Sequence, residues 1–282
     1  MKKLTDKFIL KNGVEIPCIG LGTWQSADGD TVKTAVKAAL ECGYRHIDTA
    51  AIYRNEEGIG EALKETDIPR DEIFVTTKIW NKMRGYDNAF LGFERSIGKL
   101  GLDYIDLVLI HWPASAERFD DWKELNLGTW RALTELYKDG RIKAIGVSNF
   151  LPHHLEPLME TEVQPMVNQI EFHPGFMQNE TVGYCKSNGI LVEAWSPLGT
   201  GRMLESPELS EIAKEYGKSV AQLCIIWCLQ NGALPLPKSV TPSRIRENSE
   251  VFDFEISDAD MKRINEMNDF GSSGLHPDKV DF

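Results

Sequence analysis

The stretch Gly43–Leu63, G-Y-R-H-I-D-T-A-A-I-Y-R-N-E-E-G-I-G-E-A-L, joins a predicted strand to a predicted helix. His46-Ile47-Asp48 is typical of a short strand, and Asn55-Glu56-Glu57 opens an amphipathic helix with acidic groups in its first turn, where the helix dipole favours them. Asp48 therefore lies where a strand ends, with Tyr53 on the loop just beyond it. A carboxylate and a phenol in these places are a candidate proton-transfer site, although each residue type is more often found in turns or in packing.

The same order of strand followed by helix repeats along the chain. Strands are predicted over residues 19–22, 46–48, 73–77, 105–110, 142–147, 166–170, 190–194 and 233–236. Predicted helices alternate with them over residues 31–42, 56–65, 88–100, 127–139, 153–160, 180–188, 209–216 and 220–230, and a last helix begins at Pro242. Such connections favour parallel strands with right-handed crossovers. Eight βα units in about 250 residues predict an α/β fold of the (β/α)₈ TIM-barrel type.

The N-terminal segment and the absence of a linker indicate the domain organisation. Residues 8–16 predict an N-terminal β-hairpin that turns at Asn12-Gly13. No Gly/Ser-rich linker divides the chain, so residues 1–282 are expected to form a single barrel domain. A doubly wound sheet is the competing architecture. However, Gly20–Gln25 fails the G-x-G-x-x-G pattern at its last position, and Gly217-Lys218-Ser219 lacks the upstream glycine of a Walker loop.

Composition narrows the class of protein. The 282 residues are 42% hydrophobic and 26% charged, as in a globular protein, and the formal net charge of −12 argues against nucleic acid and anionic membranes as partners. No apolar run approaches the length of a membrane span, and no apolar segment follows the basic start as in a secretory signal. The 5 cysteines are odd in number and scattered, which indicates a cytoplasmic location.

Polar and aromatic side chains follow the predicted strands. In a (β/α)₈ barrel the carboxyl ends of the strands meet at the active site. Taken singly, each of these residues is most simply a turn former, a solvated cation or a packing residue. Taken together, a carboxylate, an amine, an imidazole, amides and indoles at successive strand ends indicate one site. These residues are Trp24, Asp48, Lys78, His111, Ser148, Asn149, Gln169, Trp195, Lys238 and Ser239.

Four motifs in order carry a resemblance that covers nearly the whole chain. They are Gly43–Ala50 with Tyr53–Glu56, Leu102–Leu107 running into His111-Trp112-Pro113, Gly146–Phe150, and Lys238–Ile245 with Glu247-Asn248. With these motifs the sequence resembles the aldo-keto reductases. The short loop between Leu198 and Pro207 and the short tail are similar to those of bacterial members.

The resemblance implies NADPH-dependent reduction of aldehydes and ketones to alcohols by hydride transfer, with a small carbonyl compound as the substrate and a monomer as the working unit. It assigns catalysis to Asp48, Tyr53, Lys78 and His111. Tyr53 would donate the proton, and an adjacent Lys78 ammonium, held by Asp48, is expected to lower the pKa of the phenol. His111 would orient the substrate oxygen. Substrate-binding walls are expected from Trp24, Tyr53, Trp80, His111 and Trp112, with Phe119 and Trp122 as further candidates.

The resemblance also assigns a cofactor site for NADPH. Trp195 would stack on the nicotinamide, while Ser148, Asn149 and Gln169 would hold its carboxamide. Lys238, Ser239 and Arg244 flank the start of the last helix, where Thr241 is a candidate cap and Pro242 suits the first turn, so they predict a site for the extra phosphate of NADPH. The full expected set is Gly22, Thr23, Trp24, Asp48, Ser148, Asn149, Gln169, Trp195, Ser196, Leu198, Lys238, Ser239, Val240, Arg244, Glu247 and Asn248.

Two other functions compete with a reductase. One is a metal-dependent barrel hydrolase that would use His46, Asp48, His111, Glu171 and His173. It lacks an H-x-H pair, and Lys78 would repel a metal ion, so no metal is expected. The other is a barrel that binds NADPH as a redox sensor with little turnover, and the complete set of four catalytic residue types argues against it.

Overall fold

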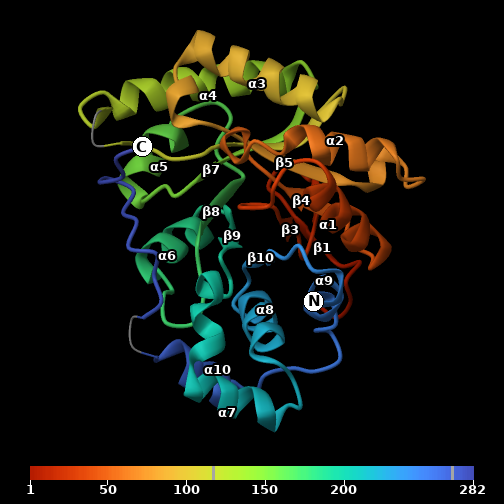
Figure 1. The fold of residues 1–282 in the computed structure, drawn as a ribbon. Coiled ribbons are helices and arrows are strands. Elements are labelled where there is room, and N and C mark those ends of the chain that lie inside the picture. The colour runs from red at the N-terminus through yellow and green to blue at the C-terminus, as the bar shows by residue number, and fades with distance from the viewer. Residues whose placement is uncertain (116–117, 268–269) are drawn as a thin grey trace.

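The structure of the protein is a computed structural model that describes residues 1–115, 118–267 and 270–282. Its centre is a sheet of 8 strands in sequential order, each parallel to its neighbour (Figure 1). The strands are β3 (Leu21–Gly22), β4 (His46–Asp48), β5 (Phe74–Ile79), β6 (Ile105–Ile110), β7 (Ile142–Ser148), β8 (Val167–Glu171), β9 (Leu191–Trp195) and β10 (Leu234–Leu236). Each lies within two residues of the position predicted from the sequence, so the (β/α)₈ fold is confirmed.

The first and last strands close the sheet into a barrel. The Gly20 amide donates to the Pro235 carbonyl at 3.1 Å, and the Gly22 amide donates to the Pro237 carbonyl at 3.0 Å. Gly22 also forms a parallel bridge with Lys238. A Cβ atom at Gly22 would lie 2.9 Å from the Leu236 carbonyl oxygen, closer than Cβ atoms approach backbone. Glycine therefore permits the seam to close, and the seam brings the end of β10 beside the end of β3.

Helices follow the strands and form the outer layer (Figure 1). They are α1 (Asp30–Glu41), α2 (Glu56–Lys64), α3 (Tyr86–Leu100), α4 (Trp122–Lys138), α5 (Pro152–Met159), α6 (Asn179–Ser187), α7 (Pro207–Glu215), α8 (Val220–Gln230), α9 (Pro242–Ser249) and α10 (Asp258–Asn265). Short 3₁₀ turns include η1 (Ala51–Tyr53), η3 (Asn81–Met83) and η5 (Gly199–Glu205). Among the described residues, no helix is long and apolar enough to span a membrane.

Two helices differ from the sequence prediction. The helix predicted from residue 127 begins at Trp122, whose ring packs edge-on against that of His154 with centroids 4.8 Å apart. This contact comes from a distant part of the chain and left no local signal. Helix α10 was not predicted, although the sequence at its start contains a signal for a helix. Ser257 Oγ accepts a hydrogen bond from the Asp260 amide, and the acidic Asp258 lies in the first turn.

The predicted N-terminal hairpin is present as β1 (Lys7–Ile9) and β2 (Glu15–Pro17), which pair antiparallel. Gly13 has φ +84° in the turn, a conformation that favours glycine. The Asn12 amide donates to the carbonyl of Lys143 at 3.0 Å, near the first residue of β7. The hairpin therefore covers the amino ends of the strands and leaves their carboxyl ends free for a site.

Candidate active site

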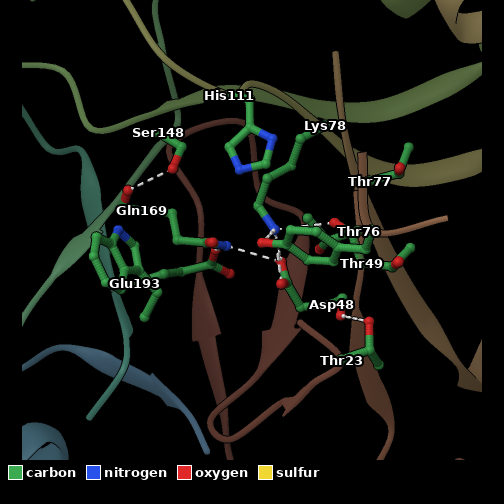
Figure 2. Close-up of polar contacts among 12 residues, drawn as sticks. Thr23, Asp48, Thr49, Thr76, Thr77, Lys78, His111, Ser148, Gln169 and Glu193 are labelled. Atoms are coloured by element: carbon green, nitrogen blue, oxygen red, sulfur yellow. Dashed lines mark hydrogen bonds and ion pairs between the residues drawn. The ribbon is translucent and has the colours of Figure 1, made fainter. Parts of the chain in front are cut away.

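A buried ion pair lies at the ends of β4 and β5 (Figure 2). Lys78 Nζ donates to both carboxylate oxygens of Asp48, at 2.7 and 2.9 Å, and to the Thr49 carbonyl at 2.9 Å. The Lys78 side chain is completely buried. Burial is the largest single effect and lowers the pKa of Lys78, but the Asp48 charge, the Asp48 hydrogen bond and the charges of Tyr53 and Glu193 together outweigh it, so the net shift is upward. The lysine therefore stays protonated at neutral pH.

The Tyr53 hydroxyl lies beside this ammonium, 3.4 Å from Lys78 Nζ. Tyr53 is the last residue of η1, a short turn that directly follows β4 and returns the phenol over the strand end. The His111 ring lies across from it, with ring centroids 5.7 Å apart in an edge-to-face arrangement. The structure thus gathers the four residues that the sequence named, from β4, η1, β5 and the residue after β6.

The predicted direction of the Tyr53 pKa shift is wrong. Burial raises the pKa of the phenol above its ordinary value; the Lys78 charge lowers it, and the Asp48 charge raises it again. The ammonium is present as expected, but removal from water has the larger effect, and burial could not be estimated from a residue in a predicted loop. The phenol accordingly keeps its proton at neutral pH. Burial and the Lys78 charge together hold the pKa of His111 well below its usual range, so this ring is neutral.

Four residues on or just after β7, β8 and β9 form a hydrogen-bonded belt next to the ion pair: Ser148, Asn149, Gln169 and Trp195. Ser148 Oγ donates to the Gln169 carbonyl at 2.8 Å, and Asn149 Nδ2 donates to the His111 carbonyl at 3.0 Å. The indole nitrogen of Trp195 donates to Asn149 Oδ1 at 2.8 Å, which orients the ring at the end of β9. The predicted amide and indole residues therefore lie together, and the belt joins them to His111.

Several residues that follow strands have left-handed backbone conformations. Asn149 has φ +64° after β7 and Ser196 has φ +53° after β9, while Gln25 and Arg54 have φ +58° and φ +57° in the loops after β3 and β4. Such conformations are uncommon outside glycine and gather at functional sites, where neighbouring structure holds them. Their position at the carboxyl ends of the strands marks this face of the barrel as the functional one.

A basic turn lies between β10 and α9, at the closed seam. Lys238 and Arg244 are exposed, and in the described ranges no carboxylate oxygen lies within 4.0 Å of either cation. Pro242 occupies the first turn of α9 as predicted, but the Thr241 side chain makes no capping hydrogen bond; instead, Ser239 Oγ accepts from the Thr241 amide at 3.0 Å. Thr241 therefore occupies the N-cap position as predicted, but it does not cap through its side chain, and Ser239 holds its backbone instead.

The other predicted cofactor residues lie at the ends of strands, in the loops that follow them and on α9. Thr23 Oγ1 donates to the Asp48 carbonyl at 2.8 Å and ties the end of β3 to that of β4. Ser196 Oγ accepts from the Thr200 amide at 2.8 Å within the turn after β9. The remaining members are Gly22 at the seam, Leu198 before η5, exposed Val240, and Glu247 and Asn248 on α9.

The predicted aromatic walls divide into two groups. Trp80 packs edge-on against His111 with centroids 5.3 Å apart and stacks on Phe282 at 5.6 Å, and Trp112 packs edge-on against the same phenylalanine. Trp24 is 47% exposed at the rim. Trp122, in contrast, packs on the histidines of α5, and Phe119 is 42% exposed.

The five residues named for a metal-dependent hydrolase do not form one metal-ligand cluster, although His173 Nε2 lies 3.4 Å from Glu171 Oε1. His46 Nε2 is paired with Thr76 Oγ1 at 2.9 Å, and its ring packs against Phe74. Glu171 accepts from the Ser273 amide at 2.8 Å and from its hydroxyl at 2.6 Å, so it anchors the C-terminal segment to β8. In the part of the chain that the structure describes, the single group with metal-ligand spacing is His153, His154 and Asp278, between α5 and that segment.

Comparisons with known proteins identify the family. The family model described as Aldo/keto reductase family matches residues 18–269. The chain belongs to this family. A glyoxal reductase of Bacillus subtilis (strain 168) is 49% identical over 280 residues, which are 99% of each chain. The crystal structure of an aldo-keto reductase from a Medee basin deep-sea metagenome library has a TM-score of 0.91 at 45% identity and covers 98% of this chain and 100% of that one.

A further relative was solved with the cofactor. The Bombyx mori aldo-keto reductase in complex with NADP has a TM-score of 0.86 at 36% identity and covers 94% of this chain and 93% of that chain. The protein is therefore an NADP-dependent oxidoreductase of the aldo-keto reductase family, whose members reduce small carbonyl compounds. The family and the cofactor predicted from the sequence are confirmed.

Features of this aldo-keto reductase fit the cofactor. No donor of the described residues reaches Gln169 Oε1, so the belt keeps an acceptor for a carboxamide. Among the residues that the structure describes, no carboxylate oxygen lies within 4.0 Å of the cations of the basic turn, although the chain carries a net charge of −12. Both ends of a dinucleotide thus have complementary groups. The sequence analysis missed Glu193 and Phe282, because an acid inside a strand and an aromatic in a tail carry no motif, and it named Glu171 only as a possible metal ligand.

Proposed function

We propose that this aldo-keto reductase reduces small aldehydes and ketones to alcohols, with Tyr53 as the proton donor to the carbonyl oxygen. The observation that supports this most is the 3.4 Å approach of the Tyr53 hydroxyl to the buried Lys78 ammonium. NADPH, when bound, supplies the hydride that the carbonyl carbon accepts. The chain's own residues have to position the carbonyl group, exclude water and move one proton.

Tyr53 is suited to this role because burial keeps its hydroxyl protonated before the reaction. As negative charge develops on the substrate oxygen, a hydrogen bond from the phenol stabilises it, and the proton then transfers to that oxygen. The nearby Lys78 ammonium stabilises the phenolate that remains, and Asp48 holds the ammonium in place. Proton donation of this kind typically contributes about 10²–10⁴-fold to a rate.

His111 is proposed to orient the substrate oxygen. Its low pKa keeps the ring neutral, so one ring nitrogen donates and the other accepts. A neutral imidazole can thus give the carbonyl oxygen a second hydrogen bond without placing a further positive charge beside Lys78.

We assign the nicotinamide end of the cofactor to the belt of Ser148, Asn149, Gln169 and Trp195, and its extra phosphate to Lys238, Ser239 and Arg244. The indole hydrogen bond fixes the plane of Trp195, which suits stacking on a flat ring. Two exposed cations and the amino end of α9, a helix of 8 residues, suit an anion. Gly22, Thr23, Trp24, Ser196, Leu198, Val240, Glu247 and Asn248 complete the proposed rim.

The substrate class follows from the walls of the site. Trp80, Trp112 and the Phe282 ring surround the approach to His111, and this aromatic enclosure favours compact, uncharged carbonyl compounds. The Bacillus subtilis relative is named a glyoxal reductase. We therefore propose small α-dicarbonyl compounds, such as glyoxal, as the preferred substrates. All 5 cysteines are free, as in a reducing compartment, and we propose a monomer in the cytoplasm.

Steady-state kinetics against a panel of aldehydes test this function. We expect NADPH oxidation that depends on the aldehyde, with kcat/KM higher for glyoxal-type dicarbonyls than for charged sugars of similar size. If the purified protein binds NADPH but turns over none of the panel, the reductase proposal fails and the cofactor-bound sensor becomes the better explanation.

A further inference from the structure

Glu193 is a buried acid that the proposed mechanism does not use. It lies on β9 two residues before Trp195, so both side chains point to the same side of the strand. The register of the sheet sets Glu193 opposite Gln169 of β8. Its side chain is fully buried, and Figure 2 shows it close to Gln169 and Asp48. A carboxyl group without access to water, this close to the ion pair, requires an explanation.

One amide nitrogen links the two acids. Gln169 Nε2 donates to Asp48 Oδ2 at 2.9 Å and to Glu193 Oε2 at 2.8 Å. The Asp48 carboxylate, which is paired with the Lys78 ammonium, can only accept, so the atom that faces it is the NH₂ and not the carbonyl of the amide. Each of its two hydrogens therefore has its own acceptor. A single bond would leave the amide free to rotate about that bond, whereas two acceptors on β4 and β9 fix its plane.

The carbonyl oxygen of this amide is consequently presented to the site. Within the described ranges, no donor hydrogen-bonds to Gln169 Oε1. The nitrogen of a carboxamide is a donor, so the fixed oxygen is complementary to the nicotinamide carboxamide that the proposed function assigns to this belt. Glu193 thus acts on the cofactor site through Gln169 and not by direct contact.

The charge of Glu193 depends on pH in the working range. Burial and the nearby Asp48 charge raise the pKa of Glu193 to about 8, against the opposing effects of the Gln169 hydrogen bond and the Lys78 charge. The facing charged groups are Asp48 on β4 and Lys78 on β5; the neighbour on β10, Leu234, is apolar. Glu193 is therefore mostly neutral at pH 7 and mostly ionised at pH 9.

We propose that Glu193 is a positioning residue, which together with Asp48 holds the Gln169 amide for the nicotinamide carboxamide and which, when ionised, favours the oxidised cofactor over the reduced one. The oxidised nicotinamide ring carries a positive charge and the reduced ring does not. A second negative charge next to Asp48 therefore attracts one form more than the other. This inference rests on the proposed assignment of Gln169 to the cofactor.

Two substitutions at this position separate hydrogen bonding from charge. Glu193→Leu removes the acceptor, and Glu193→Gln keeps an acceptor oxygen without a group that ionises. The dissociation constant of NADPH, followed by quenching of tryptophan fluorescence, is expected to rise about tenfold in Glu193→Leu, because one buried hydrogen bond is lost. In Glu193→Gln it is expected to stay within about twofold of the wild type. An unchanged constant in a folded Glu193→Leu protein, or equal loss in both variants, would overturn the positioning role.

A double-mutant cycle tests the path through Gln169. The effect of Glu193→Leu on NADPH binding is expected to disappear in a Gln169→Ala background, because no amide remains to be oriented. An effect of the same size in both backgrounds would mean that Glu193 acts by another route, and the proposal would fail. Circular dichroism and the unfolding temperature show whether each variant is folded.

The charge effect has its own readout. In the wild type, the ratio of the NADPH to the NADP⁺ dissociation constant is expected to rise several-fold as pH passes through about 8, and in Glu193→Gln it is expected to stay flat. Ionisation of the cofactor phosphates cancels in this ratio. The same pH dependence in both proteins would refute the charge effect. These are binding measurements, so they can be made even on a protein that reduces no aldehyde. A protein that binds NADPH but reduces no aldehyde would contradict the proposed function without deciding the role of Glu193.

Discussion

The strand-end cluster of Asp48, Tyr53 and Lys78 and the basic turn of Lys238 and Arg244 both carry charge, but they carry it differently. In the cluster, the Lys78 ammonium is completely buried, and the Asp48 carboxylate neutralises it through two hydrogen bonds. In the turn, the cations are exposed, and the described part of the chain places no carboxylate within 4.0 Å of them. The protein balances the first set of charges itself and leaves the second unbalanced.

This difference indicates which part of the site is already organised before a ligand binds. Removing a charge from water costs several kcal/mol unless a partner compensates it, so the buried ammonium has to be organised by the fold. Exposed cations have little desolvation cost, so they need no protein partner and can bind an anion of the ligand. The catalytic end is therefore expected to be rigid and important for stability. The phosphate end is expected to contribute to binding and little to folding.

The largest expected effect comes from removing the phenol hydroxyl. Tyr53→Phe keeps the ring and removes the proposed proton donor, so kcat is expected to fall by about 10²–10⁴-fold or more. NADPH binding is expected to stay nearly intact, because no assigned cofactor contact is lost. Stopped-flow or steady-state rates and fluorescence titration measure the two quantities. A wild-type rate in this variant would refute the role of Tyr53.

The second largest expected effect is on the free energy of unfolding, which is expected to depend on the strand-end cluster and not on the basic turn. Asp48→Asn leaves the buried Lys78 ammonium without a charged partner and is expected to cost about 3–5 kcal/mol in the free energy of unfolding, measured by urea denaturation. Arg244→Met, which also removes one charge, is expected to change that free energy by no more than about 0.5 kcal/mol.

The double variant Asp48→Asn with Lys78→Met is the matched control. It removes both buried charges, so it is expected to recover much of the stability lost in Asp48→Asn, although it remains inactive. Equal losses from Asp48→Asn and Arg244→Met would remove the distinction between the two regions.

The smallest of the three effects concerns cofactor choice. Arg244→Glu replaces a proposed phosphate partner with a repelling charge. We expect the NADPH dissociation constant to rise about 10–100-fold and that of NADH to change by less than about threefold. Arg246→Glu is the control: it makes the same charge change on α9, about 200° around the helix axis from Arg244. Equal weakening of both cofactors by Arg244→Glu would argue against the phosphate assignment.

The residues alone determined the order of elements and the chemical groups at the strand ends. Periodicity placed the eight strands within two residues of their positions because short connections between buried strands leave few alternatives. Barrel geometry then predicted that Asp48, Lys78 and His111 meet, since the carboxyl ends of all strands point to one face. The sequence motifs identified the family and its cofactor.

Only the tertiary structure determined the pKa shifts and the hydrogen bonds that depend on residues far apart in the sequence. The upward shift of the Tyr53 pKa results from burial by residues that other strands supply, which no local pattern records. The link from Asp48 through Gln169 to Glu193 joins three strands, and Glu193 within the run Leu191–Trp195 has no motif of its own. The bond between Glu171 and Ser273 spans 102 positions in the chain. Local sequence fixes which groups are present, and the closure of the barrel fixes their distances, their burial and hence their charge.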